Sequence, residues 1–255
     1  MAGHVLPVSF SMVIAVICGA CITVSLKSES EWDYFVFAQQ WPQTLCDSTD
    51  WQVPKEHNCS IPKAVTAWTV HGLWPTKSGT EGPNNCNSSW PFNLSEIKDI
   101  QPQMEVYWPN LFTDSKLESF WEHEWDKHGT CGTDLEAIDT EYKFFSAGLK
   151  LYHKLDFLKA LSSNGIAPSL TKSYSYNDVM KAFTNTFGSP AELTCYYNHT
   201  TQTSYLQQVS LCITKEFEVF DCKMANHSFY IPRYGNEERC WLNESVVIPP
   251  IVHSG

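Results

Sequence analysis

Positive charge is scarce in this sequence, and long hydrophobic runs are almost absent. The 17 Lys and Arg are outnumbered by 28 Asp and Glu, which gives a formal net charge of −11 at pH 7. The overall field of such a chain repels polyanions at neutral pH. Beyond residues 5–24 no apolar run approaches the roughly 18 residues that span a membrane, so the remainder is expected to be soluble. Fixed-period repeats, low-complexity tracts and an interdomain linker are also lacking, which predicts one domain over residues 26–255.

The N-terminal segment is typical of a secretory signal peptide. Residues 5–24 carry no charge and end in small residues, and we assign residues 1–25 to the signal, with cleavage after Ala20 or Ser25. The n-region has no Lys or Arg and the apolar run is long, so an uncleaved membrane anchor is the alternative. After removal of the signal we expect no stable membrane association. The C-terminus carries no retention tetrapeptide, which leaves secretion and the lysosomal lumen both open.

Removing residues 1–25 leaves the formal charge unchanged, because they contain no Asp, Glu, Lys or Arg. Protonation of the eight remaining histidines moves the sum from −11 to about −3, given an ordinary histidine pKa near 6.5. An acidic working compartment would therefore weaken the repulsion of a polyanionic ligand.

Cysteine and asparagine patterns indicate the same compartment. Eight of the ten cysteines follow the signal segment, and an even number there predicts four disulfides: Cys46, Cys59, Cys86, Cys131, Cys195, Cys212, Cys222 and Cys240. A zinc site would need close-set pairs such as CxxC, which these eight do not form. Six sequons predict a glycosylated protein of the secretory pathway: Asn58, Asn87, Asn93, Asn198, Asn226 and Asn243.

Hydrophobic periodicity predicts mixed helices and strands without βαβ alternation, which favours an α+β fold. Strands are expected at Tyr34–Gln40 and Ala67–Val70, and β structure again over Thr203–Phe220. The clearest helix is Leu135–Leu155, with Tyr142, Phe145, Leu149 and Tyr152 on its apolar face.

Three further helices are predicted from their start and stop signals. One covers Leu94–Trp108, with Asn93 as its N-cap and Pro102 as an interruption. A second begins after Asp114 or Ser115 and closes at Gly129. The third covers Asn177–Thr186 and ends at Gly188.

The second of these helices carries an unusual group of ionisable residues, in the run FWEHEWDKHGTC at 120–131. Glu124 and His128 lie one turn apart, as do His123 and Lys127. About fifty residues earlier, the run WTVHGLWP places His71 in an aromatic, turn-rich setting. Two histidines from separate elements, with a lysine and a glutamate between them, suit phosphodiester chemistry without a metal.

RNA cleavage of this kind needs a base for the ribose 2′-hydroxyl, an acid for the departing 5′-oxygen and positive charge for the phosphorane. Two imidazoles can act as base and acid, each contributing about 10²–10⁴-fold, and a lysine or protonated histidine can stabilise the oxyanion. DNA lacks the attacking hydroxyl and would be inert.

Two other interpretations of the cluster were weighed. Its pairs could be ordinary contacts on a helix surface worth a few tenths of a kcal/mol, although Trp121, Trp125 and Cys131 indicate an anchored, half-buried setting. The run HEWDKH is also similar to the HExxH zinc motif. In a continuous helix, however, His128 would point about 140° away from His123, and position 127 is Lys. We therefore expect neither a metal nor a cofactor.

The segments HGLWP at 71–75 and FWEHEWDKHGTC at 120–131 closely resemble the two active-site segments of the ribonuclease T2 family, most of all its animal members. The resemblance extends from FAQQWP at 37–42 to Cys240. It implies an α+β fold with a central antiparallel sheet flanked by helices. The implied activity is an acid endoribonuclease that cleaves single-stranded RNA to a 2′,3′-cyclic phosphate and then to a 3′-phosphate.

The resemblance also implies roles for single residues. His71 would be the general acid and His128 the general base, with Glu124 and Lys127 stabilising the pentacovalent phosphate and His123 holding the phosphate group. Residues expected to contact bases are Gln40, Trp74, Trp108, Pro109, Asn110 and Phe120. Many relatives have an Asp after the HGLWP proline, where this chain has Thr76, so the purine preference linked to that Asp is not carried over.

The implied disulfide pairs are Cys46–Cys59, Cys86–Cys131, Cys195–Cys240 and Cys212–Cys222. The expected partner is single-stranded RNA, bound by a monomer. The alternative function is a secreted glycoprotein of the same fold that acts by binding or signalling. Relatives of that kind usually lack one of the two paired histidines, and both are present here.

Overall fold

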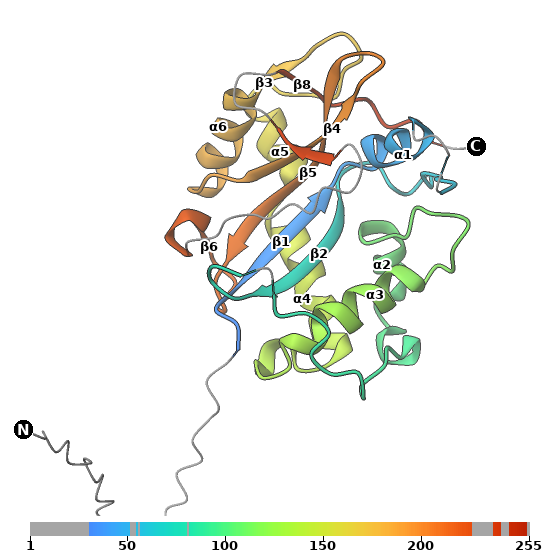
Figure 1. Ribbon diagram of the computed structural model, residues 1–255, viewed down its shortest axis with the longest axis vertical. Coiled ribbons are helices and arrows are strands. Elements are labelled where there is room, and N and C mark those ends of the chain that lie inside the picture. The colour runs from blue at the N-terminus through green and yellow to red at the C-terminus, as the bar shows by residue number, and fades with distance from the viewer. Residues whose placement is uncertain are drawn as a thin grey trace, which may run out of the picture.

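The computed structural model describes residues 31–51, 55, 57–80, 82–225, 237–240 and 245–253 (Figure 1). The predicted signal segment and the sequons at Asn226 and Asn243 lie outside the described residues. Within the described ranges, none of the helices has the length and apolar character required to cross a bilayer.

A mixed sheet forms the centre of the fold, with its principal strands in the order β2-β1-β5-β4-β7, all antiparallel to their neighbours. Strand β8 is added parallel to β5 and antiparallel to β3, and β6 pairs with β5. The strands are β1 (Tyr34–Gln40), β2 (Thr69–Thr76), β3 (Tyr174–Ser175), β4 (Glu192–Asn198), β5 (Thr203–Ile213), β6 (Val219–Phe220), β7 (Glu237–Arg239) and β8 (Ser245–Val247). The predicted antiparallel sheet is confirmed, with the parallel β5–β8 pair as an addition.

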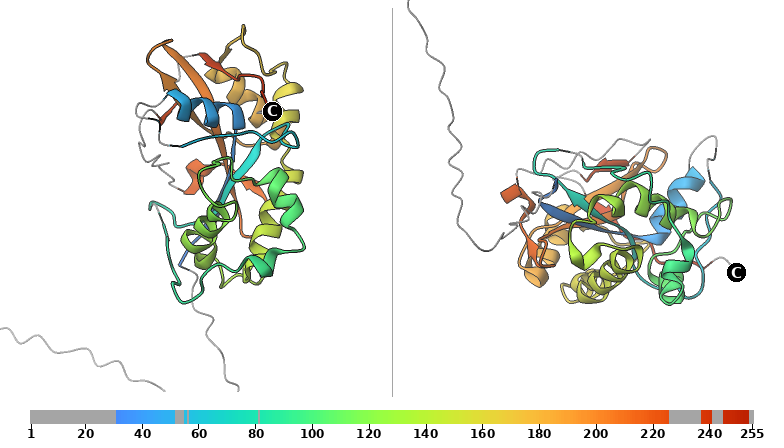
Figure 2. Two further views of the ribbon diagram at one scale, coloured as in Figure 1. Left: turned by 90° about the vertical axis from the view of Figure 1, so that its right-hand side faces the viewer. Right: turned by 90° about the horizontal axis from the view of Figure 1, so that it is seen from below.

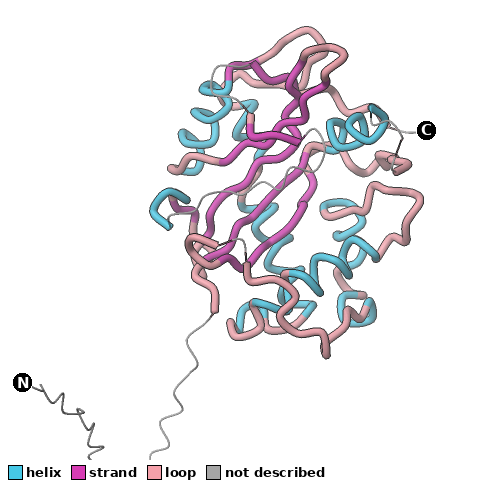
Figure 3. The backbone as a smooth tube through the Cα atoms, viewed as in Figure 1, coloured by secondary structure: helices cyan, strands magenta, loops and turns pink. Residues whose placement is uncertain are grey.

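Helices surround this sheet (Figure 3). They are α1 (Pro42–Trp51), α2 (Gln101–Tyr107), α3 (Ser119–Lys127), α4 (Glu141–Lys154), α5 (Phe157–Ser162) and α6 (Tyr176–Phe187). Short 3₁₀ turns are η1 (Leu94–Ile97), η2 (Gly129–Cys131), η3 (Glu136–Ile138) and η4 (Cys222–Ala225). The side view in Figure 2 shows α4, α5 and α6 along one face of the sheet. The predicted α+β fold is confirmed.

Several predicted elements are confirmed with their boundaries. Strand β1 spans the predicted residues, and α6 differs from the prediction by one residue at each end. Gly188 ends α6 in the left-handed conformation (φ +76°), which costs glycine little because it has no Cβ. The strand predicted at Ala67–Val70 is corrected to Thr69–Thr76, so that β2 includes the HGLWP segment.

Two predicted helices are each divided. Asn93 does accept a hydrogen bond from the Ser95 amide, but it caps the short η1 turn, and α2 starts only at Gln101. Pro102 lies in the first turn of α2, where its missing N–H costs no helical hydrogen bond. Similarly, α4 starts at Glu141 behind the Thr140 N-cap.

The buried face of α4 is rotated from the predicted one. Phe145 and Leu149 are buried as expected, but Tyr142 is 45% exposed, and Phe144 and Leu151 are buried instead. The reason is that α4 is covered by more than the sheet: it also packs against α2 and the η1 turn. A helix that packs against two partners buries a wider part of its surface than the single apolar face predicted from spacings of three and four residues.

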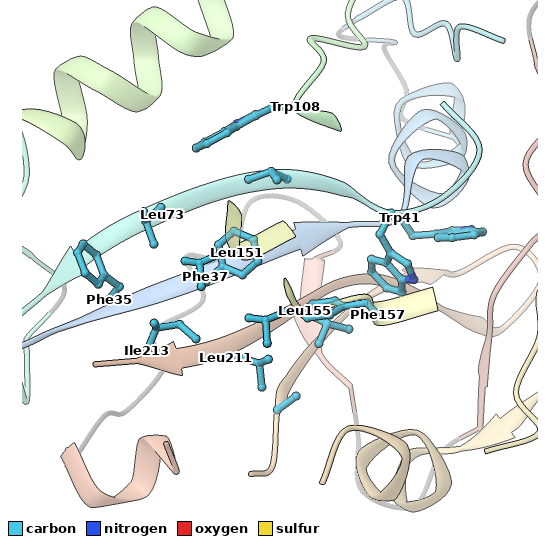
Figure 4. Close-up of a cluster of buried hydrophobic side chains, with 14 of the residues drawn as sticks. Phe35, Phe37, Trp41, Leu73, Trp108, Leu151, Leu155, Phe157, Leu211 and Ile213 are labelled. Atoms are coloured by element: carbon cyan, nitrogen blue, oxygen red, sulfur yellow. The ribbon is translucent and has the colours of Figure 1, made fainter. Parts of the chain in front are cut away.

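The main core lies between the sheet and helices α4–α6 (Figure 4). Phe35 and Phe37 of β1 point into it, as do Leu73 of β2 and Leu211 of β5. These residues alternate with side chains on the opposite face, as the period of a strand requires. Burial of each contributes about 1.5–3 kcal/mol, so Phe37→Ala should cost about 3–5 kcal/mol. The opposite face carries only a smaller buried cluster, which includes Val36 and Cys212.

The four disulfides form with the pairing that the resemblance implied: Cys46–Cys59, Cys86–Cys131, Cys195–Cys240 and Cys212–Cys222. Cys86–Cys131 fixes the segment after β2 to the residues that follow α3. The Asn85 amide also donates to the Lys127 carbonyl at 2.8 Å, so the C-terminal end of α3 is held twice.

Candidate active site

The face of the sheet opposite the main core presents polar side chains from three neighbouring strands. In the register of β1 with β5, Ala38 lies opposite Ser210 and Gln40 opposite Gln208. Trp74 of β2 belongs to the same face, because it pairs with Val36, two residues before Ala38. We call this surface the site face.

A β-bulge places His71 on the site face. Ala38 pairs with Gly72 and Gln39 pairs with Val70, so His71 is the extra residue of β2. Without the bulge, strict alternation would put His71 on the same side as the buried Leu73. The bulge reverses that alternation, and the imidazole is half-buried on the side that carries Trp74.

Four contacts hold His71 in place. Its Nδ1 is hydrogen-bonded to Oε1 of Gln208, from β5. Its ring packs edge-on against Trp74, with centroids 5.1 Å apart, and lies 5.9 Å from the ring of Phe120. The indole of Trp108 donates to the His71 carbonyl at 3.0 Å, which anchors the bulged backbone itself.

Helix α3 supplies the other ionisable residues. It begins at Ser119, after Glu118, which makes no side-chain cap, so the predicted cap at Asp114 or Ser115 is wrong. The start is instead fixed by packing: Trp121 is fully buried and donates to the Trp108 carbonyl at 2.6 Å. Helix and bulge therefore share one anchor, Trp108.

His128 lies just past the end of α3, and this changes where its ring points. It is the C-cap residue of α3 (φ −119°, ψ −48°), and Gly129 directly follows it, as the predicted closure of the helix requires. Its ring centroid lies 6.5 Å from that of His123 and 5.5 Å from that of Trp74. The predicted divergence of about 140° between the two side chains therefore does not keep their rings apart.

This proximity does not create a cluster of metal ligands. In the part of the chain that the structure describes, no three His, Cys, Asp or Glu side chains are placed to hold a metal ion together.

Trp74 connects the two histidines. Its ring lies within 5.5 Å of both His71 and His128, and its N–H donates to Glu124 Oε2 at 2.9 Å. Gly72 makes this contact possible, since a Cβ there would lie 2.0 Å from the indole nitrogen and 2.3 Å from Glu124 Oε2. The structure thus brings His71, Glu124 and His128 together around one indole.

Burial dominates the electrostatics of this cluster. It lowers the pKa of His71 to about 4 and lowers the pKa values of His123 and His128 as well, with the Lys127 ammonium adding to each effect. Burial also raises the pKa of Glu124 to about 8, against the opposing influence of the Trp74 N–H and Lys127. All four groups therefore favour their neutral forms at pH 7.

These pKa shifts change the net charge that the composition alone predicts for acidic solution. Three of the eight histidines outside the signal segment resist protonation, so the sum of about −3 is reached only at a lower pH than ordinary histidines would require. The buried Glu124 is neutral in the same pH range, so it adds no negative charge beside the imidazoles.

The residues expected to contact bases are placed in different ways. Phe120 is half-buried beside His71, and Gln40 is buried on the site face, level with Gln208. Asn110 uses its side-chain amide to hold its own loop, donating to Ser115, Lys116 and Ser119. Pro109 is buried beside it.

Trp108 is 0% exposed, and an indole without exposed surface offers no face on which a base can stack. Its place among base-contacting residues is therefore corrected, and its observed contacts are those that anchor His71 and Trp121.

Gln208 was not found from the sequence. It lies 77 residues or more from either motif, in a strand of alternating residues where a glutamine is unremarkable. The only available signal was its alternation with Ser210 on one face of a predicted strand.

Comparison with known proteins decides the family. The model of the "Ribonuclease T2 family" matches residues 32–222. The chain belongs to the ribonuclease T2 family. It is therefore an enzyme of the ribonuclease class.

Relatives support this assignment over most of the chain. Ribonuclease Oy of Magallana gigas is 41% identical over 224 residues, covering 87% of this chain and 98% of the relative. Ribonuclease T2 of Homo sapiens is 36% identical over 205 residues, covering 80% and 75%. The crystal structure of human RNase T2 superposes with a TM-score of 0.69 at 32% identity, covering 86% of this chain and 99% of that one. RNase NT in complex with 5′-AMP gives 0.70 at 29%, covering 87% and 100%.

Proposed function

We propose that this ribonuclease cleaves single-stranded RNA endonucleolytically, without a metal ion, by attack of the ribose 2′-oxygen on the adjacent phosphorus. The observation that carries the proposal is the pair of imidazoles, His71 and His128, each within 5.5 Å of the same indole. The O2′–P bond forms and the P–O5′ bond breaks, which gives a 2′,3′-cyclic phosphate. Slower hydrolysis then gives the 3′-phosphate.

In the first step, His128 accepts the proton of the 2′-hydroxyl and His71 delivers a proton to the 5′-oxygen. A base must be neutral at the working pH, and the lowered pKa of His128 ensures this in mildly acidic solution. Its Nδ1 is buried without a partner among the described groups. In the second step the two roles are exchanged.

His71 must be protonated to act as an acid, although burial lowers its pKa to about 4 in the free enzyme. A bound phosphodiester places a negative charge beside the ring and raises that pKa. Acidic pH and bound substrate together therefore produce the active protonation state, which is consistent with an acid ribonuclease.

Glu124, Lys127 and His123 surround the reacting phosphate. With a pKa raised to about 8, Glu124 is a neutral carboxyl in an acidic compartment and can donate a hydrogen bond to a phosphoryl oxygen without repelling it. The Lys127 ammonium supplies positive charge for the pentacovalent intermediate. His123, exposed at the edge of the site, holds the phosphate group.

Base binding is assigned to the aromatic side chains around His71. We propose Trp74 and Phe120 as stacking residues and Gln40 as a hydrogen-bonding one, with Pro109 and Asn110 shaping the adjoining loop. Stacking of this kind contributes about 1–3 kcal/mol per base. Structures of RNase NT with 5′-AMP and of RNase MC1 variants with 5′-GMP or 5′-UMP are among the related ones.

The protein is further proposed to work as a monomer in the secretory pathway, either secreted or in the lysosomal lumen. The four disulfides support an oxidising compartment. The exposed sequons at Asn58 and Asn93 support glycosylation there.

The test is cleavage of oligoribonucleotides across a pH series in EDTA, with analysis of the product ends. His71→Phe and His128→Phe should each lower the rate by at least 10²-fold while circular dichroism stays unchanged. His199→Phe replaces an exposed histidine that directly follows β4; it is the matched control and should keep the wild-type rate. Near wild-type rates in either site variant, or loss of wild-type activity in EDTA, would refute the proposal. A well-folded wild type without activity would favour the binding or signalling function.

A further inference from the structure

Gln208 spans a neighbouring strand to reach His71. Strand β1 separates β5 from β2 in the sheet, so the glutamine side chain must cross β1 before its Oε1 meets His71 Nδ1. The small side chain of Ala38, opposite Ser210 in the register, leaves room for this crossing. The other end of the amide is also used, since Gln208 Nε2 donates to Ser210 Oγ at 3.2 Å.

The amide has one direction in the structure: its Nε2 lies toward Ser210 Oγ and its Oε1 toward His71 Nδ1. With the amide in this direction, Oε1 accepts a hydrogen bond when Nδ1 carries the proton. In a neutral imidazole, the hydrogen bond made by one ring nitrogen determines which of the two nitrogens carries the proton. We propose that Gln208 is a positioning residue that keeps the His71 proton on Nδ1 and so presents Nε2 to the leaving oxygen.

The catalytic consequence of this positioning role rests on the proposed function. In the imidazolium form both nitrogens carry protons, and the one at Nδ1 is engaged by Gln208. Only the Nε2 proton is then transferred to O5′, and the neutral product already has the tautomer that the hydrogen bond favours. The ring need not turn or exchange protons with solvent between the two chemical steps.

A neutral amide has a second consequence, because it orients the imidazole without adding a charge. The charged and titratable groups around His71 are those of the α3 segment, namely His123, Glu124, Lys127 and His128. None of the basic groups favours the imidazolium, and the carboxyl of Glu124 is neutral below about pH 8. A carboxylate at position 208 would instead hold His71 in its charged form.

The experiment compares Gln208→Leu and Gln208→Glu with the wild type by ¹⁵N NMR of the histidine rings, with the His71 signals assigned by their loss in His71→Phe. The wild type should show the Nδ1–H tautomer. In Gln208→Leu the proton should shift toward Nε2. In Gln208→Glu the Nδ1–H tautomer should persist, and the pKa of His71 should rise by about one to three pH units. Gln103→Glu, an exposed residue of α2, adds the same charge elsewhere and should leave His71 unchanged.

Kinetics provide the second measurement. Gln208→Leu should lower kcat by about 10- to 100-fold with KM nearly unchanged, because general acid catalysis is impaired and not substrate binding. Gln208→Glu should keep most of the wild-type kcat and move the alkaline limb of the pH–rate profile to higher pH. A purely structural role would lower stability without moving that limb.

The two proposals fail in different ways. An Nε2–H tautomer in the wild type, or identical His71 signals in all three proteins, overturns the role of Gln208 whatever the activity. If instead the NMR changes occur as expected but the wild type does not cleave RNA, the positioning role stands and the proposed function is wrong.

Discussion

Replacement of Glu124 by Gln should remove most of the pH dependence of stability above neutrality. Glu124 is 1% exposed, and its Oε2 accepts a hydrogen bond from the Trp74 indole. Glutamine keeps the shape of the side chain and a carbonyl oxygen for that N–H, but it has no proton to lose. The substitution therefore isolates the free energy of ionising a buried carboxyl.

The expected magnitude follows from the pKa. Burial raises the pKa of Glu124 from 4.5 to about 8, so between these values the unfolded chain has released the proton while the folded protein retains it. The folded state then binds more protons, and stability falls as pH rises. The stability that protonated Glu124 contributes to the folded state is fully present below pH 4.5 and is lost as pH rises through about 8. At 1.36 kcal/mol per pH unit the total loss is about 5 kcal/mol, as an upper figure.

The measurement is the free energy of unfolding in urea from pH 6.5 to 8, a range in which titration of His71 does not change stability with pH. The pKa of His71 is lowered to about 4, so its contribution is lost only as pH falls from 6.5 through 4. Over this window the wild type should lose about 2 kcal/mol relative to Glu124→Gln. Glu122→Gln, at an exposed position of the same helix, should follow the wild type. Parallel curves for wild type and Glu124→Gln would refute the reasoning.

Three further predictions concern anchoring and modification. Cys86–Cys131 and Cys195–Cys240 both close 45 residues, so removing either pair by double Ser substitution should cost about 4 kcal/mol, measured by urea unfolding. Only loss of the first pair should also lower kcat, because it holds the end of α3; equal kcat in both variants would contradict this. Gly72→Ala should lower stability by about 2–5 kcal/mol and reduce activity, since its Cβ overlaps the indole–carboxyl hydrogen bond, and a wild-type melting temperature would show that the site relaxes. Asn198 is 7% exposed and its Oδ1 caps a turn, whereas Asn58 is exposed. Peptide mass mapping should therefore find glycan on Asn58 and none on Asn198.

Prediction from the sequence succeeded where the signal was local. The strand Tyr34–Gln40 is rich in aromatic and β-branched residues, and the helix before Gly188 has both a periodic face and a glycine stop. Prediction failed where a neighbour decided the outcome. The start of α3 is set by the burial of Trp121 against the Trp108 carbonyl, and no cap at residue 114 or 115 competes with that contact.

The sequence by itself determined the chemical groups of the site, because two motifs carry all five ionisable residues, and it determined the family through the same motifs. The tertiary structure alone decided how those groups face one another. A one-residue bulge turns His71 away from the core, the end of a helix turns His128 toward Trp74, and Gln208 arrives from a strand almost 140 residues away. The physical reason is that these directions depend on strand register and on contacts distant in the chain, while the identity and spacing of residues constrain only their immediate neighbours.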